Sequence, residues 1–562
     1  MGQPMLLNRL MSMQKERKRR RQIQSRNGYR RLNASEAQKD SPCQEDEYSQ
    51  GGKRLRYSGA NLPEVRYHLE QKFTPYHFIV FLYEKLIPSQ SQCQLSMLVQ
   101  DILCHIHSLM SLQDAARAAC VSHTFLRSWR CYPKLTLTNK TLGLKRNAVK
   151  KGDIAKGFAS RVDHILKYHS GIGLKTFRLE SHDYCNVEIY LSSWLQVAFR
   201  SGIEEVALLL PSCYNFPCSL LFDGHGNSIR DLYLTDCAFR PAIGFDCLRS
   251  LTKLHLYRVR ITDDELGRLL SSSFALEQLV LRYCTELICL KIPFSLERLS
   301  FLKVLTCKML QMIENKAPNL STFHFFGDPV PLSFGESSQV KNLKVQLSRE
   351  ANSIYYSITK FPCVMPHLET LTISSFRERV NSPMVANKFI HLKYLEIYLS
   401  GGCASVSPTF DYLSLAAFLI ASPFLKTFIL SVHQDDMKHD SVFEHASHMR
   451  HMPEYKHERL KNVQVVGFCS AKSMVELACH ILENATSLES LTVDTVYDEE
   501  DDEKTGRCSV RRTGKCSPIT SHMILEAHKA LKAVKRYILG KVPSKVKLNV
   551  RGPCSRCHAI EL

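Results

Sequence analysis

Two clusters of cysteine and histidine have spacings that could hold a metal ion or a haem. One is Cys554, Cys557 and His558, and the other is His445, His448 and His451. The first has the spacing of a c-type haem attachment site or of half a zinc site. A structural zinc needs four ligands, and the first cluster offers only three. Haem attachment requires an export signal, and we expect none in this chain. The three histidines of the second cluster have polar neighbours. We therefore expect no metal and no other cofactor.

Catalytic motifs are not found in this sequence. It contains no nucleophile-elbow glycines, no phosphate-binding loop and no zinc-hydrolase histidine pair. Scattered Ser, His and Asp occur in any chain of 562 residues. We expect a protein that is not an enzyme.

From residue 174 onward one apolar pattern recurs: a hydrophobic residue, two variable residues, a hydrophobic, one variable and a hydrophobic. The repeats are separated by 20 to 35 residues. The last two apolar positions lie two apart, so they point to the same side of a strand. The pattern starts at Leu174, Ile203, Ile229, Leu251, Leu276, Leu296, Leu320, Val340, Leu368, Leu392, Leu425, Leu460 and Leu488.

A single strand per repeat cannot bury its apolar face, so neighbouring repeats must stack with parallel strands and share one core. Cys237 and Cys284 follow their strands at the position where leucine-rich repeats place Asn or Cys. Helices are expected at Tyr190 to Gly202 and Ser473 to Ala485. The region resembles an irregular leucine-rich-repeat solenoid of the α/β class, preceded by a short helical module.

The preceding module, from Asp101 to Trp129, has the pattern of two amphipathic helices. Ile102, Ile106 and Leu109 form one apolar stripe, and Asp114 is placed to cap a second helix beginning at Ala115. About thirty residues bury too little surface to fold well alone. The module therefore requires a partner.

These residues resemble the F-box of plant F-box/leucine-rich-repeat proteins, the substrate receptors of SCF-type ubiquitin ligases. The family opens with Leu-Pro-Glu-Asp-Ile, whereas here Leu62, Pro63 and Glu64 are separated from Asp101 by Val65 to Gln100. We interpret this insertion as a retained intron or alternative exon; an evolved insertion is the alternative. The resemblance implies adaptor binding through Leu62, Pro63, Ile102, Ile106, Leu109, Leu112, Val121, Ser122 and Trp129.

The end of the chain also resembles the family, whose receptors close with an FBD-type unit similar to Leu460 to Asp494. An acidic run and a basic run follow it, then an amphipathic helix and a strand at Lys545 to Val550 that would cap the solenoid. We expect a disordered basic tail at 1–60, the F-box module at 61–135, interrupted at 65–100, the solenoid at 136–497, a charged disordered loop at 498–518 and the cap at 519–562.

Charge and cysteine usage bear on location. Of the formal net charge of +20, residues 1–60 contribute a basic excess concentrated at 15–21, which could serve as a nuclear-import signal. The 21 cysteines lie scattered among apolar residues, which suits a reducing compartment. We expect the nucleus, the cytoplasm or both, no membrane association, and nucleic-acid binding only as a less favoured alternative.

The resemblance implies a substrate-recognition subunit that joins a Skp-family adaptor and a cullin-based ligase core to an unknown target protein. The alternative is a non-catalytic leucine-rich-repeat scaffold with an impaired F-box. Variable strand positions face away from the core, so they are candidates for target binding. The candidates are Tyr233, His255, Tyr257, Arg282, His324, Tyr394 and Tyr398.

Overall fold

The computed structural model describes residues 94–554 apart from short gaps, the longest of which are 401–409 and 498–519. The chain forms two units, Met1–Ile87 and Pro88–Leu562, and every described residue lies in the second unit. The basic tail, Leu62, Pro63, most of the 65–100 insertion and the charged loop therefore lie outside the described residues.

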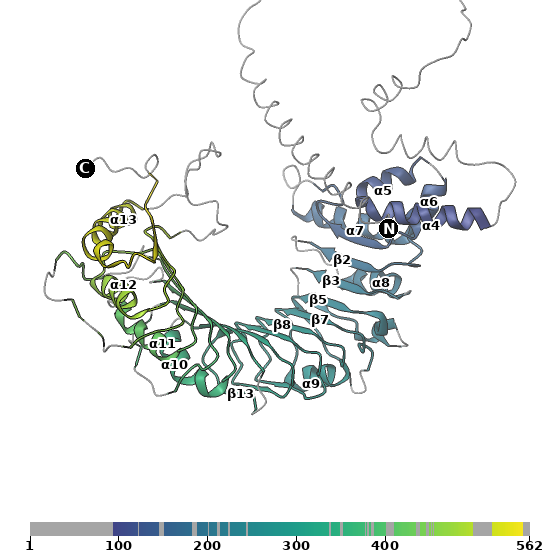
Figure 1. The fold of residues 1–562 in the computed structure, drawn as a ribbon. Helices are drawn as coiled ribbons and strands as arrows, with labels where there is room; N and C mark the ends of the chain where they lie inside the picture. Colours follow the sequence, from purple (N-terminus) through teal and green to yellow (C-terminus); the bar gives the residue numbers. More distant parts are fainter. Residues whose placement is uncertain are drawn as a thin grey trace, which may run out of the picture. The chain divides into compact units, whose positions relative to one another are not determined.

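A parallel sheet of 15 strands runs through this unit (Figure 1) and confirms the predicted fold class. Each strand pairs with the next one along the sheet, in the order that the sequence gives them. The strands are β1 (Lys134–Thr138), β2 (Thr176–Glu180), β3 (Glu205–Leu209), β5 (Asp231–Thr235), β7 (Lys253–Tyr257), β8 (Gln278–Arg282), β10 (Phe301–Leu305), β12 (Thr322–Gly327), β14 (Asn342–Leu347), β15 (Thr370–Phe376), β16 (Tyr394–Ser400), β17 (Thr427–His433), β18 (Asn462–Val466), β19 (Ser490–Asp494) and β20 (Lys547–Arg551).

Burial alternates along each strand because successive side chains point to opposite faces of the sheet. In β7, Leu254 and Leu256 are buried, whereas Lys253, His255 and Tyr257 lie on the other face. Twelve of the thirteen predicted repeat starts stand two residues before a strand of this kind. The start at Leu296 is wrong: the buried pair of β10 is Leu302 and Val304, so that repeat starts at Leu299.

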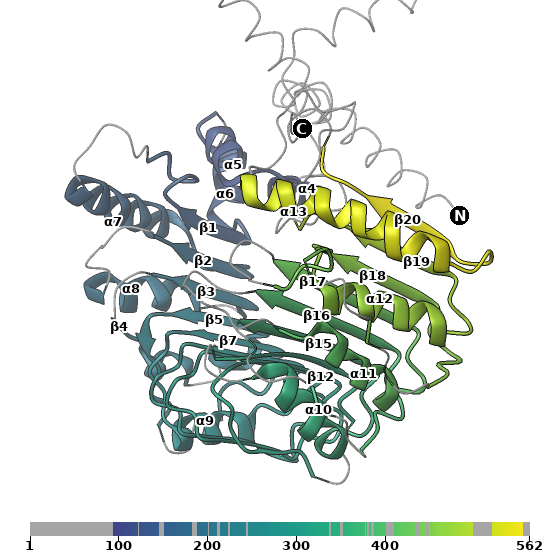
Figure 2. The same ribbon diagram turned by 90° about the vertical axis from the view of Figure 1, so that its left-hand side faces the viewer.

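Helices and short turns cover the face that carries the leucines (Figure 2). The predicted helices at 190–202 and 473–485 are present, with slightly different bounds. The elements on this side include α7 (Lys151–Tyr168), α8 (Glu188–Ala198), α9 (Asp263–Ser272), α10 (Ser353–Val364), α11 (Ala416–Ala421) and α12 (Lys472–Asn484), together with the short strands β4 (Tyr214–Asn215), β6 (Cys237–Ala238), β9 (Cys289–Ile292), β11 (Met312–Asn315) and β13 (Leu332–Ser333). The opposite face of the sheet, which we name the open face, lies on the inner side of its curve (Figure 1).

Four consecutive repeats leave their strands through a residue in the left-handed backbone region. These residues are Asp236, Arg258, Tyr283 and Thr306, with φ between 52° and 56°. The N–H groups of the first three donate to the carbonyls of Tyr257, Arg282 and Leu305 on the next strand, at 2.7 to 2.9 Å. The turn directs the following residue back into the core. Cys237 and Cys284 are fully buried there, as is Val259 at the same position.

The chain continues past β19 with α13 (Ser521–Ala533), the π-turn η4 (Val534–Ile538) and the short η5 (Leu539–Lys541), and ends its described part with β20. Ala527, Val534 and Ile538, which lie where the sequence predicts an amphipathic helix, are buried. β20 pairs in parallel with β19 and forms the last strand of the sheet.

Candidate protein-interaction site

The module before the solenoid contains three helices, α4 (Gln94–Leu109), α5 (Leu112–Ala119) and α6 (His123–Arg130), not the predicted pair. The predicted cap is also wrong. α5 begins at Leu112 because Ser111 is its N-cap: the Ser111 hydroxyl accepts the backbone N–H of Asp114 at 3.2 Å. Asp114 instead accepts a hydrogen bond from that hydroxyl and pairs with Arg117.

α4 turns one apolar side inward and another outward. Leu103 and His107 are buried, and the ring of His107 lies 5.3 Å from that of Phe125 in α6. Burial lowers the pKa of His107 and so favours its neutral ring. Ile102 is 52% exposed and Leu109 is 75% exposed. The inward residues hold the helices together, which leaves the outward ones available for a partner.

The residues predicted to bind an adaptor therefore fall into three groups. Ile102, Leu109 and Val121 are exposed, and Ile106 is half-buried beside them. Leu112 and Trp129 are buried in the core that the module shares with the first repeats, where Trp129 lies 5.6 Å from Tyr132. These two support the helices and do not present a surface. The remaining three predicted residues, Leu62, Pro63 and Ser122, lie outside the described residues.

The helix that carries the exposed stripe begins within the insertion. α4 starts at Gln94 and runs without a break past Gln100, where the insertion was predicted to end. Residues from the insertion thus form the first turns of this helix. In the F-box family that the sequence resembles, this place holds the proline of the opening motif.

On the open face, an arginine and tyrosine cluster lies where β7 and β8 end. The Arg282 guanidinium lies 5.2 Å from the ring centres of both Tyr257 and Tyr283. Arg258 lies 5.0 Å from the Tyr257 ring and pairs with Asp236 at 2.8 Å. The left-handed residues described above bring Arg258 and Tyr283 to this position, and a cluster of aromatic rings and arginines is typical of protein-binding surfaces.

The other predicted target-binding residues also lie on the open face, but they are spread along it. Tyr233 and His255 stack at 5.4 Å on β5 and β7. His324 lies on β12, and Tyr394 and Tyr398 lie on β16. All five are partly buried by their neighbours. The predicted set is therefore brought to one face and not to one compact site.

Sequence reasoning missed the lysines of this face. Lys303 on β10 and Lys344 on β14 occupy the same strand position as Tyr233 and His255. The misplaced repeat start at Leu296 hid Lys303. A repeat that starts at Leu296 has its strand before Lys303, so Lys303 was not assigned a variable strand position. Lys344 was visible in its correctly predicted repeat but was passed over in favour of aromatic residues.

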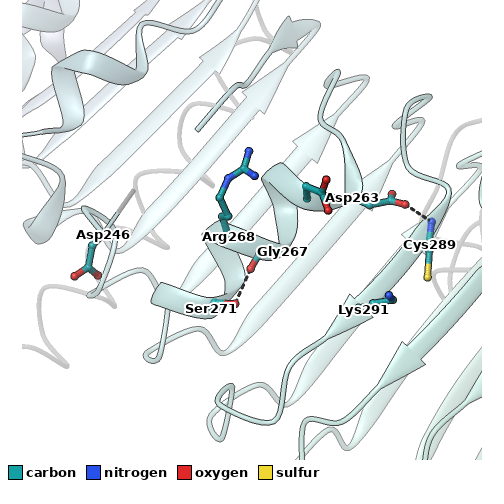
Figure 3. Close-up of a pocket in the computed structure, with 8 residues that line it drawn as sticks. Asp246, Asp263, Gly267, Arg268, Ser271, Cys289 and Lys291 are labelled. Atoms are coloured by element: carbon teal, nitrogen blue, oxygen red, sulfur yellow. Dashed lines mark hydrogen bonds between the residues drawn. The ribbon is translucent and has the colours of Figure 1, made fainter. Parts of the chain in front are cut away.

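The helix-covered side carries a hollow of about 620 Å³ beside α9 (Figure 3). Its carboxylates include Asp263, whose oxygens accept the backbone N–H groups of Ile288 and Cys289 at 2.8 Å. Ser271 donates its hydroxyl hydrogen to the Gly267 carbonyl. Asp263 and Ser271 therefore already bond to the backbone, and Asp246, Arg268 and Lys291 line the same hollow.

Among the described residues, no group of three or more His, Cys, Asp or Glu could hold a metal ion. Cys554 is described, whereas Cys557, His558 and the three predicted histidines are not. No helix in the described ranges has the length and apolar character needed to cross a membrane.

Comparison with known proteins agrees with this architecture. The sequence model of the At1g61320/AtMIF1 LRR-domain family matches residues 165–555. The chain belongs to this family. It is also 23% identical over 421 residues to At5g56810 of Arabidopsis thaliana, named as an F-box/FBD/LRR-repeat protein, with 71% of this chain and 89% of that protein covered. Membership of this LRR family and the relative's name support a plant protein with a role in protein interaction.

Proposed function

We propose that this LRR-family chain is a substrate-recognition subunit of an SCF-type E3 ubiquitin ligase. In this proposal α4, α5 and α6 act as the F-box that binds a Skp-family adaptor, the segment at 460–494 is the FBD-type end, and the open face of the solenoid holds the target. The chain supplies no acid or base. It raises the effective concentration of the target beside the ubiquitin carrier that a cullin-based core brings.

The outward stripe of α4 is the observation that carries the proposal. Ile102 and Leu109 are each more than half exposed on a helix whose inward side is already filled. Val121, in the turn between α5 and α6, is also more than half exposed. Covering one such side chain contributes roughly 1 to 2 kcal/mol. A stripe of this kind is stabilised when another protein covers it, and the relative named as an F-box protein is consistent with an adaptor as that protein.

The start of α4 inside the insertion favours a second candidate, a repeat scaffold with an impaired F-box. The position that carries proline in the F-box family holds Val99, which lies inside α4, so no proline fixes where this helix begins. In this candidate the solenoid binds its partner without delivering it to a ligase.

A pull-down with a plant Skp-family adaptor separates the two candidates. We expect the full chain to retain the adaptor, and Ile102→Asp together with Leu109→Asp to lower retention at least tenfold. Ile189→Asp is the matched control, because Ile189 is 70% exposed on α8, away from the three helices. No retention by the unchanged chain, or equal retention by the stripe variant, contradicts the proposal.

We also propose that the protein works in the nucleus, the cytoplasm or both, on the strength of the basic cluster at 15–21. Imaging a fluorescent fusion with and without residues 1–60 tests this, and unchanged distribution would remove the cluster as an import signal.

A further inference from the structure

One part of the open face carries basic side chains and no acidic ones. It comprises the first, third and fifth positions of six neighbouring strands, β7, β8, β10, β12, β14 and β15, and we name it the basic segment. None of these described positions is Asp or Glu. Its basic members are Lys253, Arg282, Lys303, Lys344, His255 and His324. The strands on either side of the basic segment carry acidic residues at equivalent positions of the same face. These residues are Asp231 on β5 and Glu396 on β16.

Most of these cations are not neutralised. Lys253 pairs with Asp231 at 3.1 Å. For Arg282, Lys303 and Lys344, the described residues provide no ion pair within 4.0 Å. Positive charge left uncompensated on a concave surface attracts and orients anions.

Two of the lysines are placed around a histidine. Lys303, His324 and Lys344 lie side by side in register on β10, β12 and β14. Adjacent strands are about 4.8 Å apart, so the two lysines start about 10 Å apart, the length of three residues of an extended chain. Burial and then the charges of Lys303 and Lys344 lower the pKa of His324. An anion bound between the two lysines would offset the repulsion between their positive charges.

Arg282 lies at the carboxyl end of the same segment. Its guanidinium is packed near the rings of Tyr257 and Tyr283, which restricts its position while its side chain stays exposed. A guanidinium held in this way can form two parallel hydrogen bonds to one carboxylate.

The neighbouring residues favour a protein over a nucleic acid as the source of the anion. Three other positions of the basic segment carry amide side chains, namely Gln278, Asn342 and Gln346. These amides can form hydrogen bonds to a peptide backbone. Three uncompensated cations are also fewer than the six to ten phosphate contacts typical of proteins that bind nucleic acids tightly.

We infer that the basic segment binds an acidic stretch of a partner protein, with carboxylates spaced about three residues apart lying over Lys303, Lys344 and Arg282. This inference rests on the proposed function insofar as the partner is the target that the solenoid holds. Phosphorylated side chains on such a stretch would present the same anionic chemistry.

The test measures binding of the full chain to a labelled twelve-residue peptide with Glu at every third position and Ser or Gly elsewhere. Controls are the same peptide with Gln for Glu, with phosphoserine for Glu, and a single-stranded oligonucleotide of twelve nucleotides. We expect the Glu peptide to bind at least tenfold more tightly than the Gln peptide, with an affinity that falls as salt is added. Tighter binding of the phosphoserine peptide supports the site and assigns phosphate as the source. Tighter binding of the oligonucleotide than of either acidic peptide overturns the inference.

Lys303→Glu combined with Lys344→Glu should weaken binding of the Glu peptide about tenfold or more. Lys360→Glu is the matched control, because Lys360 is exposed on α10, on the helix-covered side of β14 and β15. Circular dichroism checks that both variants fold. Unchanged binding by the folded double variant overturns the inference.

The adaptor pull-down distinguishes failure of this inference from failure of the proposed function. The lysine variant should retain the adaptor as the unchanged chain does. If the unchanged chain binds the Glu peptide but no adaptor, the acidic-partner site stands and the scaffold candidate replaces the ligase subunit.

Discussion

Ile102 and Leu103 are neighbours in α4, yet Ile102 exposes 52% of its surface and Leu103 exposes 4%. Burial of Leu103 sets which side of α4 faces inward and leaves Ile102 on the outer side. Deleting residues 65–100 would join Glu64 to Asp101 and place Pro63 at the helix start. We expect the shortened chain to bind the adaptor more tightly, by about tenfold, because proline fixes the entry of the helix. Titration of both chains with the adaptor measures this, and equal affinity would show that the insertion does not affect docking.

Arg450 joins two carboxylates that belong to different elements. Its guanidinium lies 2.7 Å from Glu476 of α12, whose side chain is fully buried, and 2.8 Å from Asp411. Removing the guanidinium leaves a carboxylate without its counter-charge. We expect Arg450→Ala to lower the free energy of unfolding by about 3 kcal/mol, and Glu476→Gln in the same chain to restore part of it. Urea unfolding checks both, and a loss below about 0.5 kcal/mol would show that the pair does not stabilise the fold.

Glu526 of α13 predicts a dependence of stability on acid. Burial alone would raise its pKa, but hydrogen bonds from His439 and Ser470 outweigh burial and lower the pKa to about 2. Its backbone partner, the Ser470 N–H, lies 2.7 Å away. Because the folded pKa is below the usual 4.5, this carboxylate stabilises the fold above about pH 4.5, and the contribution is lost as the pH falls toward 2.

The measurement is the urea midpoint from pH 6 to pH 3, with Glu526→Gln as the comparison. The variant should be less stable at pH 6 and should lose less stability on acidification. If the urea midpoint changed with pH by the same amount in both proteins, this carboxylate would be excluded as a source of acid sensitivity.

Thr306 is a β-branched residue with φ of 52°, a backbone region that favours glycine. The cost for a residue with a Cβ is about 1 to 2 kcal/mol. Thr306→Gly should therefore stabilise the protein by up to about 1 kcal/mol after the added freedom of the unfolded chain is counted. Thr370→Gly, in the extended strand β15, should destabilise it. Thermal unfolding compares them, and destabilisation of equal size at both positions would contradict the strain argument.

The parallel sheet could be predicted because every repeat must bury two strand residues against its neighbours, and that requirement leaves an apolar pattern in the sequence. The misplaced start at Leu296 has the same cause. Leu296, Leu299 and Phe301 satisfy the pattern as well as Leu299, Leu302 and Val304 do, and Leu296 is itself fully buried below the strand. Hydrophobicity alone could not decide which set forms the strand.

The sequence did not predict which side of α4 faces outward, nor the turns that follow the strands. α4 has apolar residues on more than one side, since Leu103 is buried and Ile102 and Leu109 are exposed, so the pattern does not say which side a partner meets. The four left-handed positions hold Asp, Arg, Tyr and Thr. They share no residue type, because hydrogen bonding to the next strand maintains the turn.

The unbroken parallel register of the sheet has a consequence for how this lineage can change. Each strand pairs only with the one before and the one after it, so a duplicated or lost repeat would leave the distant pairings as they are. Unequal recombination within such a gene could lengthen or shorten the row of contact positions one unit at a time. New specificities could then arise by resizing this contact surface as well as by substitution.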